Sequence, residues 1–217
     1  MTKRAMSEQE RLELDKRIKD VEEQTGAQIV LAVIERSDVY AELPWKAFAL
    51  GTAVAGLAIS LAAAVHARWP TAFGAQMSVP VMLATGATCA LACVFLPRFA
   101  RLFLETLRAE VEVRQYAESL FLSREVFNTR ERTGIVMLVS LFEQQIVLVP
   151  DRGLRKRLSD AAAQGIIARM RTLLAMGRVA AAFGAGLDGL EAVLTPSAAH
   201  GSQGNELPDS IIEEKGP

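Results

Sequence analysis

The hydrophobic and polar positions divide the chain into an uncharged middle and two charged flanks. From Ala47 to Pro97 the sequence has no acidic side chain and one formal charge, Arg68. Two apolar segments lie in this stretch, at about residues 47–67 and 77–96. Each is long enough for a helix to cross a hydrocarbon core of about 30 Å. Because a helix satisfies its own backbone hydrogen bonds in lipid, the pattern predicts a transmembrane helical hairpin over residues 44–97.

The segment before the hairpin predicts one helix followed by one strand. Ser7 and Glu10 form a capping-box pattern at the start of the helix, and Gly26 suits the left-handed position at its end. The run at residues 27–34 is apolar throughout and rich in β-branched side chains. Such a strand is typical of a sheet that helices cover on both faces.

The segment after the hairpin predicts the remainder of the same domain. Its pattern indicates one helix from Arg98 to about Phe121, a pair of strands within residues 134–149, and two further helices. We therefore expect one discontinuous α/β domain made of residues 1–43 and 98–196. The Ser/Gly/Pro/Glu-rich residues 197–217 predict a disordered tail.

Charge and composition narrow the class of partner. The chain has 24 basic and 25 acidic side chains and a net charge of −1, so no bulk attraction to nucleic acid is expected. The N-terminus lacks the apolar region of a signal peptide, and we expect the hairpin itself to direct insertion into the bilayer.

The distribution of Lys and Arg predicts the orientation of the hairpin. Basic residues on the two flanks outnumber those on the link between the spans, and the positive-inside rule places the richer side in the cytoplasm. We expect a multi-pass protein of the bacterial inner (cell) membrane with both termini cytoplasmic. The residues that carry this bias are Arg36 and Lys46 before the hairpin, Arg68 in the link, and Arg98, Arg101 and Arg108 after the hairpin.

Candidate catalytic chemistry is sparse in this sequence. No phosphate-binding glycine loop, zinc spacing or calcium-loop pattern occurs, so no metal or cofactor is expected. The two histidines, His66 and His200, fall at a span end and in the tail, which argues against Ser/His/Asp or Cys/His hydrolases. No catalytic residue is assigned.

The apolar segments carry stripes of small residues that would let helices approach closely. Such stripes fit packing within the hairpin, or contact between two copies in a homodimer. The first stripe is Thr52, Gly56, Ser60 and Ala64, and the second is Thr85, Cys89 and Cys93.

Two basic clusters flank the predicted strand pair. Arg130 and Arg132 precede the first strand, and Arg152 follows the second. Antiparallel pairing brings these arginines to one end of the sheet, where they could bind a phosphate, a carboxylate or an anionic lipid headgroup. A solvated basic loop is the alternative.

The order of these elements resembles that of the TPM domain family. The resemblance implies a three-layer α/β/α domain with a small sheet, and membrane-associated accessory roles or acid phosphatase activity. The sequence departs from the family pattern in its hairpin, and at the strand turn, where Phe142-Glu143-Gln144 leaves one carboxylate. The residues that carry the resemblance are Thr25–Val30, Tyr116-Ala117, Thr133–Val139, Gln145–Val149, Arg152–Leu154 and Gly186-Leu187.

Two functions therefore remain open at this stage. The α/β domain is expected to be a non-catalytic interaction module at the bilayer, bound to a membrane or cytoplasmic protein. The alternative is a weak membrane-associated phosphatase. The lack of a paired carboxylate or histidine constellation favours the interaction module.

Overall fold

The computed structural model describes residues 6–65, 71–195 and 211–216, and the chain divides into two compact units. The first unit combines Met1–Asp38 with Leu107–Pro217. The second unit is Val39–Thr106, the part of the chain that contains the apolar segments.

The described strands of the first unit form one four-stranded sheet in the order β3-β2-β1-β4. β1 (Gln28–Ile34) pairs in parallel with β2 (Gly134–Ser140), with Leu31 opposite Met137. β3 (Gln145–Pro150) is antiparallel to β2, as expected for a strand pair. β4 (Ile212–Glu214) lies parallel to β1 on its other edge.

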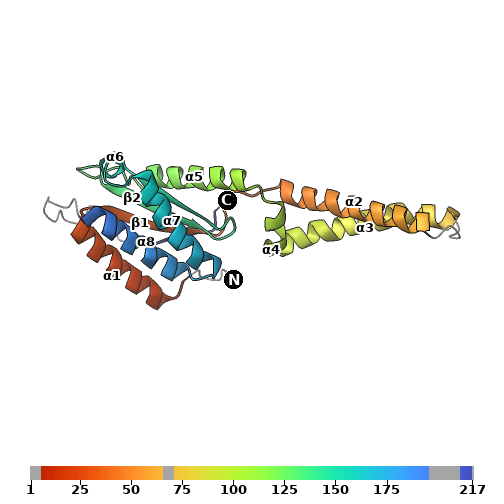
Figure 1. Cartoon of the computed structure of the whole chain (residues 1–217), viewed down its shortest axis with the longest axis horizontal. Coiled ribbons are helices and arrows are strands. Elements are labelled where there is room, and N and C mark those ends of the chain that lie inside the picture. Colours follow the sequence, from red (N-terminus) through yellow and green to blue (C-terminus); the bar gives the residue numbers. More distant parts are fainter. Residues whose placement is uncertain (1–5, 66–70, 196–210, 217) are drawn as a thin grey trace. The chain divides into compact units, whose positions relative to one another are not determined.

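Helices cover both faces of this sheet, which confirms the expected three-layer α/β/α fold class (Figure 1). α1 (Glu8–Thr25), α7 (Asp160–Ala175) and α8 (Val179–Leu194) pack on one face, and α5 (Thr106–Ser123) packs on the other.

Alternate side chains of β1 supply the two cores that these helices bury. Ile29, Leu31 and Val33 belong to the core under α1, α7 and α8. Val30, Ala32 and Ile34 belong to the core under α5. All seven residues of β1 and all seven of β2 are buried. A strand that buries both faces reads as a continuous apolar run, which is why the sequence predicted it.

The capping interactions predicted for the two ends of α1 are present in the structure. The Ser7 hydroxyl accepts a hydrogen bond from the Glu10 amide at 3.2 Å, and the Glu10 carboxylate accepts one from the Ser7 amide at 2.8 Å. Gly26 ends the helix with φ of 69°. That left-handed conformation carries no Cβ penalty for glycine.

The second unit contains a pair of long apolar helices. They are α2 (Glu42–Val65) and α3 (Thr71–Phe95), followed by the single-turn α4 (Pro97–Ala100) and the 3₁₀ turn η1 (Arg101–Phe103). Both long helices contain a segment long and apolar enough to span a membrane, Glu42–Val65 and Gln76–Phe95. Most of their side chains are exposed in the structure.

Two sequence predictions differ from the structure. The helix expected from Arg98 to about Phe121 is interrupted, because Leu104 adopts an extended conformation between η1 and α5. The disordered tail expected at residues 197–217 is wrong at its end, where Ile212–Glu214 forms β4. Residues 196–210 lie outside the described part of the chain.

We predict that Gly134→Ala destabilises the α/β unit. A Cβ at Gly134 would lie 2.1 Å from the carbonyl oxygen of Val126, so β2 or its neighbour would have to shift. Such overpacking costs about 1–3 kcal/mol. Hydrogen exchange of the β1 and β2 amides, measured on the full chain in detergent, should become faster by the factor that corresponds to this loss in the free energy of unfolding.

Gly165→Ala is the matched control for that substitution. Gly165 lies in exposed α7 sequence with no atom near the added Cβ, and alanine favours helix by about 1 kcal/mol. Exchange of the same amides should therefore be unchanged or slower. Equal rates in the two alanine variants would contradict the close approach at Gly134.

Candidate functional site

The turn between β2 and β3 holds a buried carboxylate, Glu143. Its Oε1 accepts hydrogen bonds from the Ser37 amide at 2.8 Å and the Ser37 hydroxyl at 2.7 Å. Its Oε2 accepts a hydrogen bond from the Ser140 hydroxyl. Ser37 and Glu143 are each 7% exposed, and Ser140 is fully buried. Both oxygens of this carboxylate are thus engaged by the chain itself.

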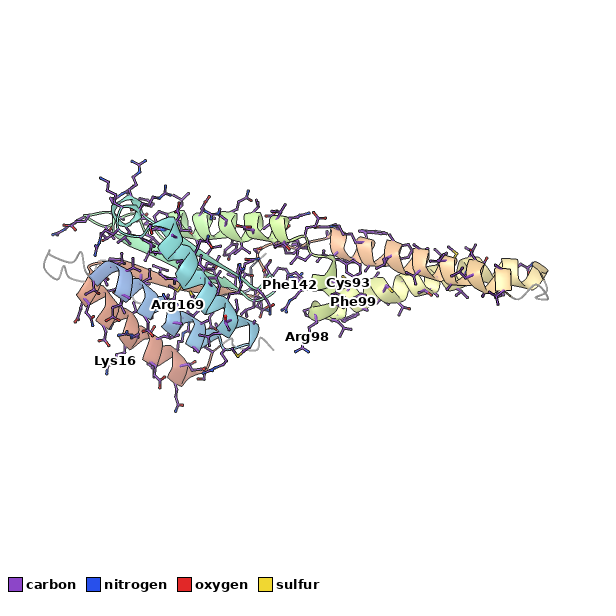
Figure 2. All side chains as sticks on the ribbon, viewed as in Figure 1. Lys16, Cys93, Arg98, Phe99, Phe142 and Arg169 are labelled. Carbon is purple, nitrogen blue, oxygen red and sulfur yellow. The ribbon has the colours of Figure 1, made fainter. Side chains whose placement is uncertain are left out.

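The backbone around Glu143 places these groups together. The Leu141 amide donates to the Ile34 carbonyl at 2.9 Å, and the Phe142 amide donates to the Glu35 carbonyl at 2.9 Å. These bonds continue the β1–β2 pairing past the ends of both strands. Phe142 lies in the turn (Figure 2), and the guanidinium carbon of Arg36 lies 4.8 Å from its ring centroid.

An ion-pair cluster lies beside this turn, where the chain leaves and re-enters the α/β unit. The Arg108 guanidinium pairs with the Asp38 carboxylate at 2.9 Å and with the Glu112 carboxylate at 3.7 Å. Asp38 ends the first part of the unit, and Arg108 lies at the start of the second. The pair therefore brings the two ends of the discontinuous unit together.

This arrangement offers one chemical possibility and one obstacle. A serine hydroxyl hydrogen-bonded to a carboxylate is the geometry of a nucleophile with its base. The obstacle is burial, since a substrate has little access to Ser37 and none to Ser140. Within the described residues no group of three or more His, Cys, Asp or Glu is placed to hold a metal ion. His66 and His200 lie outside the described residues.

The predicted anion-binding arginines lie at the opposite end of β2. The Gly153 amide donates a hydrogen bond to the Arg132 carbonyl at 2.9 Å. The basic segment before β2 and the basic segment after β3 therefore meet, as expected. Arg130 and Arg152 are exposed.

Arg132 already has a carboxylate partner at this end. Its Nε lies 3.2 Å from Oδ2 of Asp151, which is 6% exposed, and its guanidinium lies over the Phe127 ring. Asp151 also caps the single-turn helix α6 (Arg152–Arg155) by accepting from the Arg152 amide. No pattern in the sequence indicated that Asp151 pairs with the arginines. Anion binding by Arg130, Arg132 and Arg152 stays a prediction.

A second polar site, which was not predicted from the sequence, lies between α5 and β4. The Tyr116 hydroxyl donates to the Glu214 carboxylate at 2.6 Å, and Arg124 pairs with the same carboxylate at 3.0 Å. A cavity of about 390 Å³ adjoins them, lined also by Ser119, Leu120 and Ser123. No motif marked this site, because Glu214 lies in sequence that reads as an unstructured tail.

The pKa values at this site follow from the contacts. The hydrogen bond from Tyr116 lowers the pKa of Glu214 and outweighs desolvation, and Arg124 lowers it further. Desolvation, followed by the hydrogen bond to the Glu214 carboxylate, raises the pKa of Tyr116 to about 12. Glu214 is therefore ionised and Tyr116 neutral at pH 7.

The small residues of the apolar segments divide between the inside and the outside of the helix pair. Thr52 and Gly56 face α3, where a Cβ at Gly86 would lie 2.3 Å from the Thr52 hydroxyl and one at Gly56 would lie 2.9 Å from Met82. On α3, Cys93 is buried, whereas Cys89 and Thr85 are partly buried. Ser60 and Ala64 are exposed.

Two contact residues of the helix pair were not in either predicted stripe. A Cβ at Gly51 would lie 2.8 Å from the sulfur of Cys89 and 3.2 Å from the Cα of Gly86, so the helices pack closely around Gly51 and Gly86. Small residues at such a contact let two backbones come together. Whether the exposed part of the first stripe contacts a second copy stays a prediction.

The fold and the site place the chain in a class of three-layer α/β/α domains. Residues 97–193 match the family model of the TPM domain. This match covers less than half of the chain, and in the structure α1 and β1, from before the apolar helices, share a sheet and a core with the matched residues.

One solved structure has a similar fold. It is the NMR structure of the BA42 protein from the psychrophilic bacterium Bizionia argentinensis, with a TM-score of 0.58 and 12% sequence identity. The comparison covers 98% of each chain. No curated protein matches this sequence.

We predict that Glu143→Ala destabilises the strand turn. The substitution leaves the Ser37 amide and two buried hydroxyls without their acceptor, and each unpaired buried group costs about 1–3 kcal/mol. Amide exchange at Ser37 and Phe142 should increase by at least tenfold. Glu143→Gln, which keeps one carbonyl oxygen, should lose less, and unchanged exchange in the alanine variant would refute a structural role for Glu143.

Proposed function

We propose that the chain is a membrane-anchored interaction module whose TPM domain has no catalytic activity of its own. The observation that carries this proposal is the hydrogen bonding and burial of Glu143. Its two oxygens accept three hydrogen bonds from within the domain, and it is buried. A carboxylate held in this way stabilises the turn and is poorly placed to act as a base or a metal ligand.

The apolar helices support the membrane part of the proposal. Only 11% of the residues in each apolar window are buried, so these helices do not resemble the core of a soluble domain. Large apolar side chains such as Leu57, at 62% exposed, and Leu91, at 58% exposed, face outward. Lipid is the environment that suits such a surface. Neither apolar helix lies near the N-terminus, where a signal sequence would be.

A weak membrane-associated phosphatase is the second candidate. The hydrogen bond from the Ser37 hydroxyl to Glu143 supports it, because this geometry could activate a nucleophile. We place this candidate second because both groups are only 7% exposed.

A phosphatase assay on the purified full chain separates the two candidates. We expect no hydrolysis of an aryl phosphate above the rate of a Ser37→Ala variant, with or without added Mg²⁺, Mn²⁺ or Ca²⁺, between pH 4 and pH 9. The Ser37→Ala control removes the candidate nucleophile and retains the protein preparation and any contaminating enzyme. Turnover that is lost in Ser37→Ala would overturn the non-catalytic assignment.

We further propose that both termini face the cytoplasm of a bacterial cell and that the link between the apolar helices faces outward. The support is the excess of Lys and Arg on the two flanks. In a Cys89→Ala, Cys93→Ala background, a cysteine at Ala72 should react with an impermeant maleimide in intact cells, and one at Ser202 should react only after lysis. The opposite labelling would invert the topology.

A further inference from the structure

The C-terminal segment Ile211–Glu214 docks on the free edge of β1 as a short parallel strand. Three residue pairs join β4 to β1, from Ala32 opposite Ile212 to Ile34 opposite Glu214. Ile211 is 4% exposed in the core under α1, α7 and α8, and Ile212 is 9% exposed in the core under α5. The segment therefore inserts one apolar side chain into each core of the domain.

Polar groups of the domain form hydrogen bonds with this segment. Arg11 donates to the Ile211 carbonyl at 2.7 Å, and the Glu35 amide donates to the Glu214 carbonyl at 3.2 Å. The Glu214 carboxylate accepts from Tyr116 on α5 and from Arg124, which directly follows α5. Main-chain bonds to a sheet edge, with side-chain pockets that select alternate residues, form the usual recognition mode for an added strand. The edge of β1, the two cores and these polar groups together form the receptor for the segment. The receptor fits two successive apolar residues and an acidic residue two positions after the second.

β4 is paired with β1 over fewer positions than β1 is paired with β2. β1 pairs with β2 over seven positions and with β4 over three. Residues 196–210 connect α8 to the segment and could span roughly 50 Å when extended. Short edge elements of this kind open at a lower free energy than the central strands.

We propose that this edge of β1 is a strand-exchange site, at which the Ile211–Glu214 segment of a second copy of the chain replaces the cis segment. A second copy carries the one sequence that the receptor is seen to fit, and identical elements exchange with the same contacts at little cost. The inference rests on the proposed membrane interaction role, because anchoring in one bilayer raises the effective concentration of neighbouring copies.

Cysteine cross-linking between differently tagged full-length chains tests the exchange. Both chains carry Cys89→Ala and Cys93→Ala, one with Val33→Cys and the other with Glu213→Cys. Val33 and Glu213 are register partners. Glu213 has a buried oxygen, Oε1, with no hydrogen-bond partner, so its replacement costs the fold no hydrogen bond at that atom. After co-expression and oxidation in membranes, we expect a disulfide-linked dimer that carries both tags.

A register control distinguishes exchange from random collision. Ile29 lies on the same strand and in the same core as Val33, about 13 Å away along β1. The Ile29→Cys chain with the Glu213→Cys chain should give at least tenfold less dimer. Arg124→Gln with Tyr116→Phe, placed in the Val33→Cys chain, should also reduce the dimer, because the Glu214 carboxylate of the cross-linked segment docks on Tyr116 and Arg124 of that chain.

The same two cysteines in a single chain give the remaining outcomes. A disulfide within one chain, without dimer between chains, would overturn the exchange and leave the proposed interaction role standing. Equal dimer from the Val33 and Ile29 pairs would also overturn the exchange. Absence of both disulfides would contradict the docking of β4 itself.

Discussion

The parallel pairing of β1 with β2 is the interaction on which the rest of the α/β unit depends. Gln28–Ile34 and Gly134–Ser140 are separated by about a hundred residues of sequence, and every residue of both strands is buried. A sheet that is apolar on both faces requires helices on both faces. It also requires neighbours on its outer edges, which β3 and β4 supply. The apolar helices lie in sequence between the two strands but form a compact unit of their own.

The same pairing determines what lies at each end of the sheet. At the carboxyl ends of β1 and β2 it brings Ser37 next to Glu143, where two hydrogen bonds hold the β2–β3 turn against the chain leaving β1 and a third, from Ser140, lies within the turn. Parallel strands often bind ligands at this end. Here the groups that could bind a ligand bind one another. This geometry supports the proposed interaction role, and β4 marks the edge of β1 at which we propose that a strand is exchanged.

The long apolar and periodic segments of this chain could be predicted from its sequence, whereas contacts made by short polar segments could not. β1, β2 and α1 were predicted because a continuous apolar run and a capping box are local signals. β4 was missed because three residues in a polar tail carry no periodicity, and its stability comes from cores and receptors far away in sequence. The break at Leu104 was missed because the flanking residues keep a helical pattern. The Asp151 partner of Arg132 was missed because burial of a carboxylate depends on tertiary packing.

Excision of the apolar unit tests most directly whether the β1–β2 pairing defines an independent domain. Asp38 and Arg108 form an ion pair at 2.9 Å, so a short Gly/Ser linker in place of residues 39–106 can join the two ends. In the variant with this linker, hydrogen exchange should be slowest at the amides of β1 and β2, and their protection should equal that in the full chain. Rapid exchange throughout β1, with α7 and α8 still protected, would contradict the account.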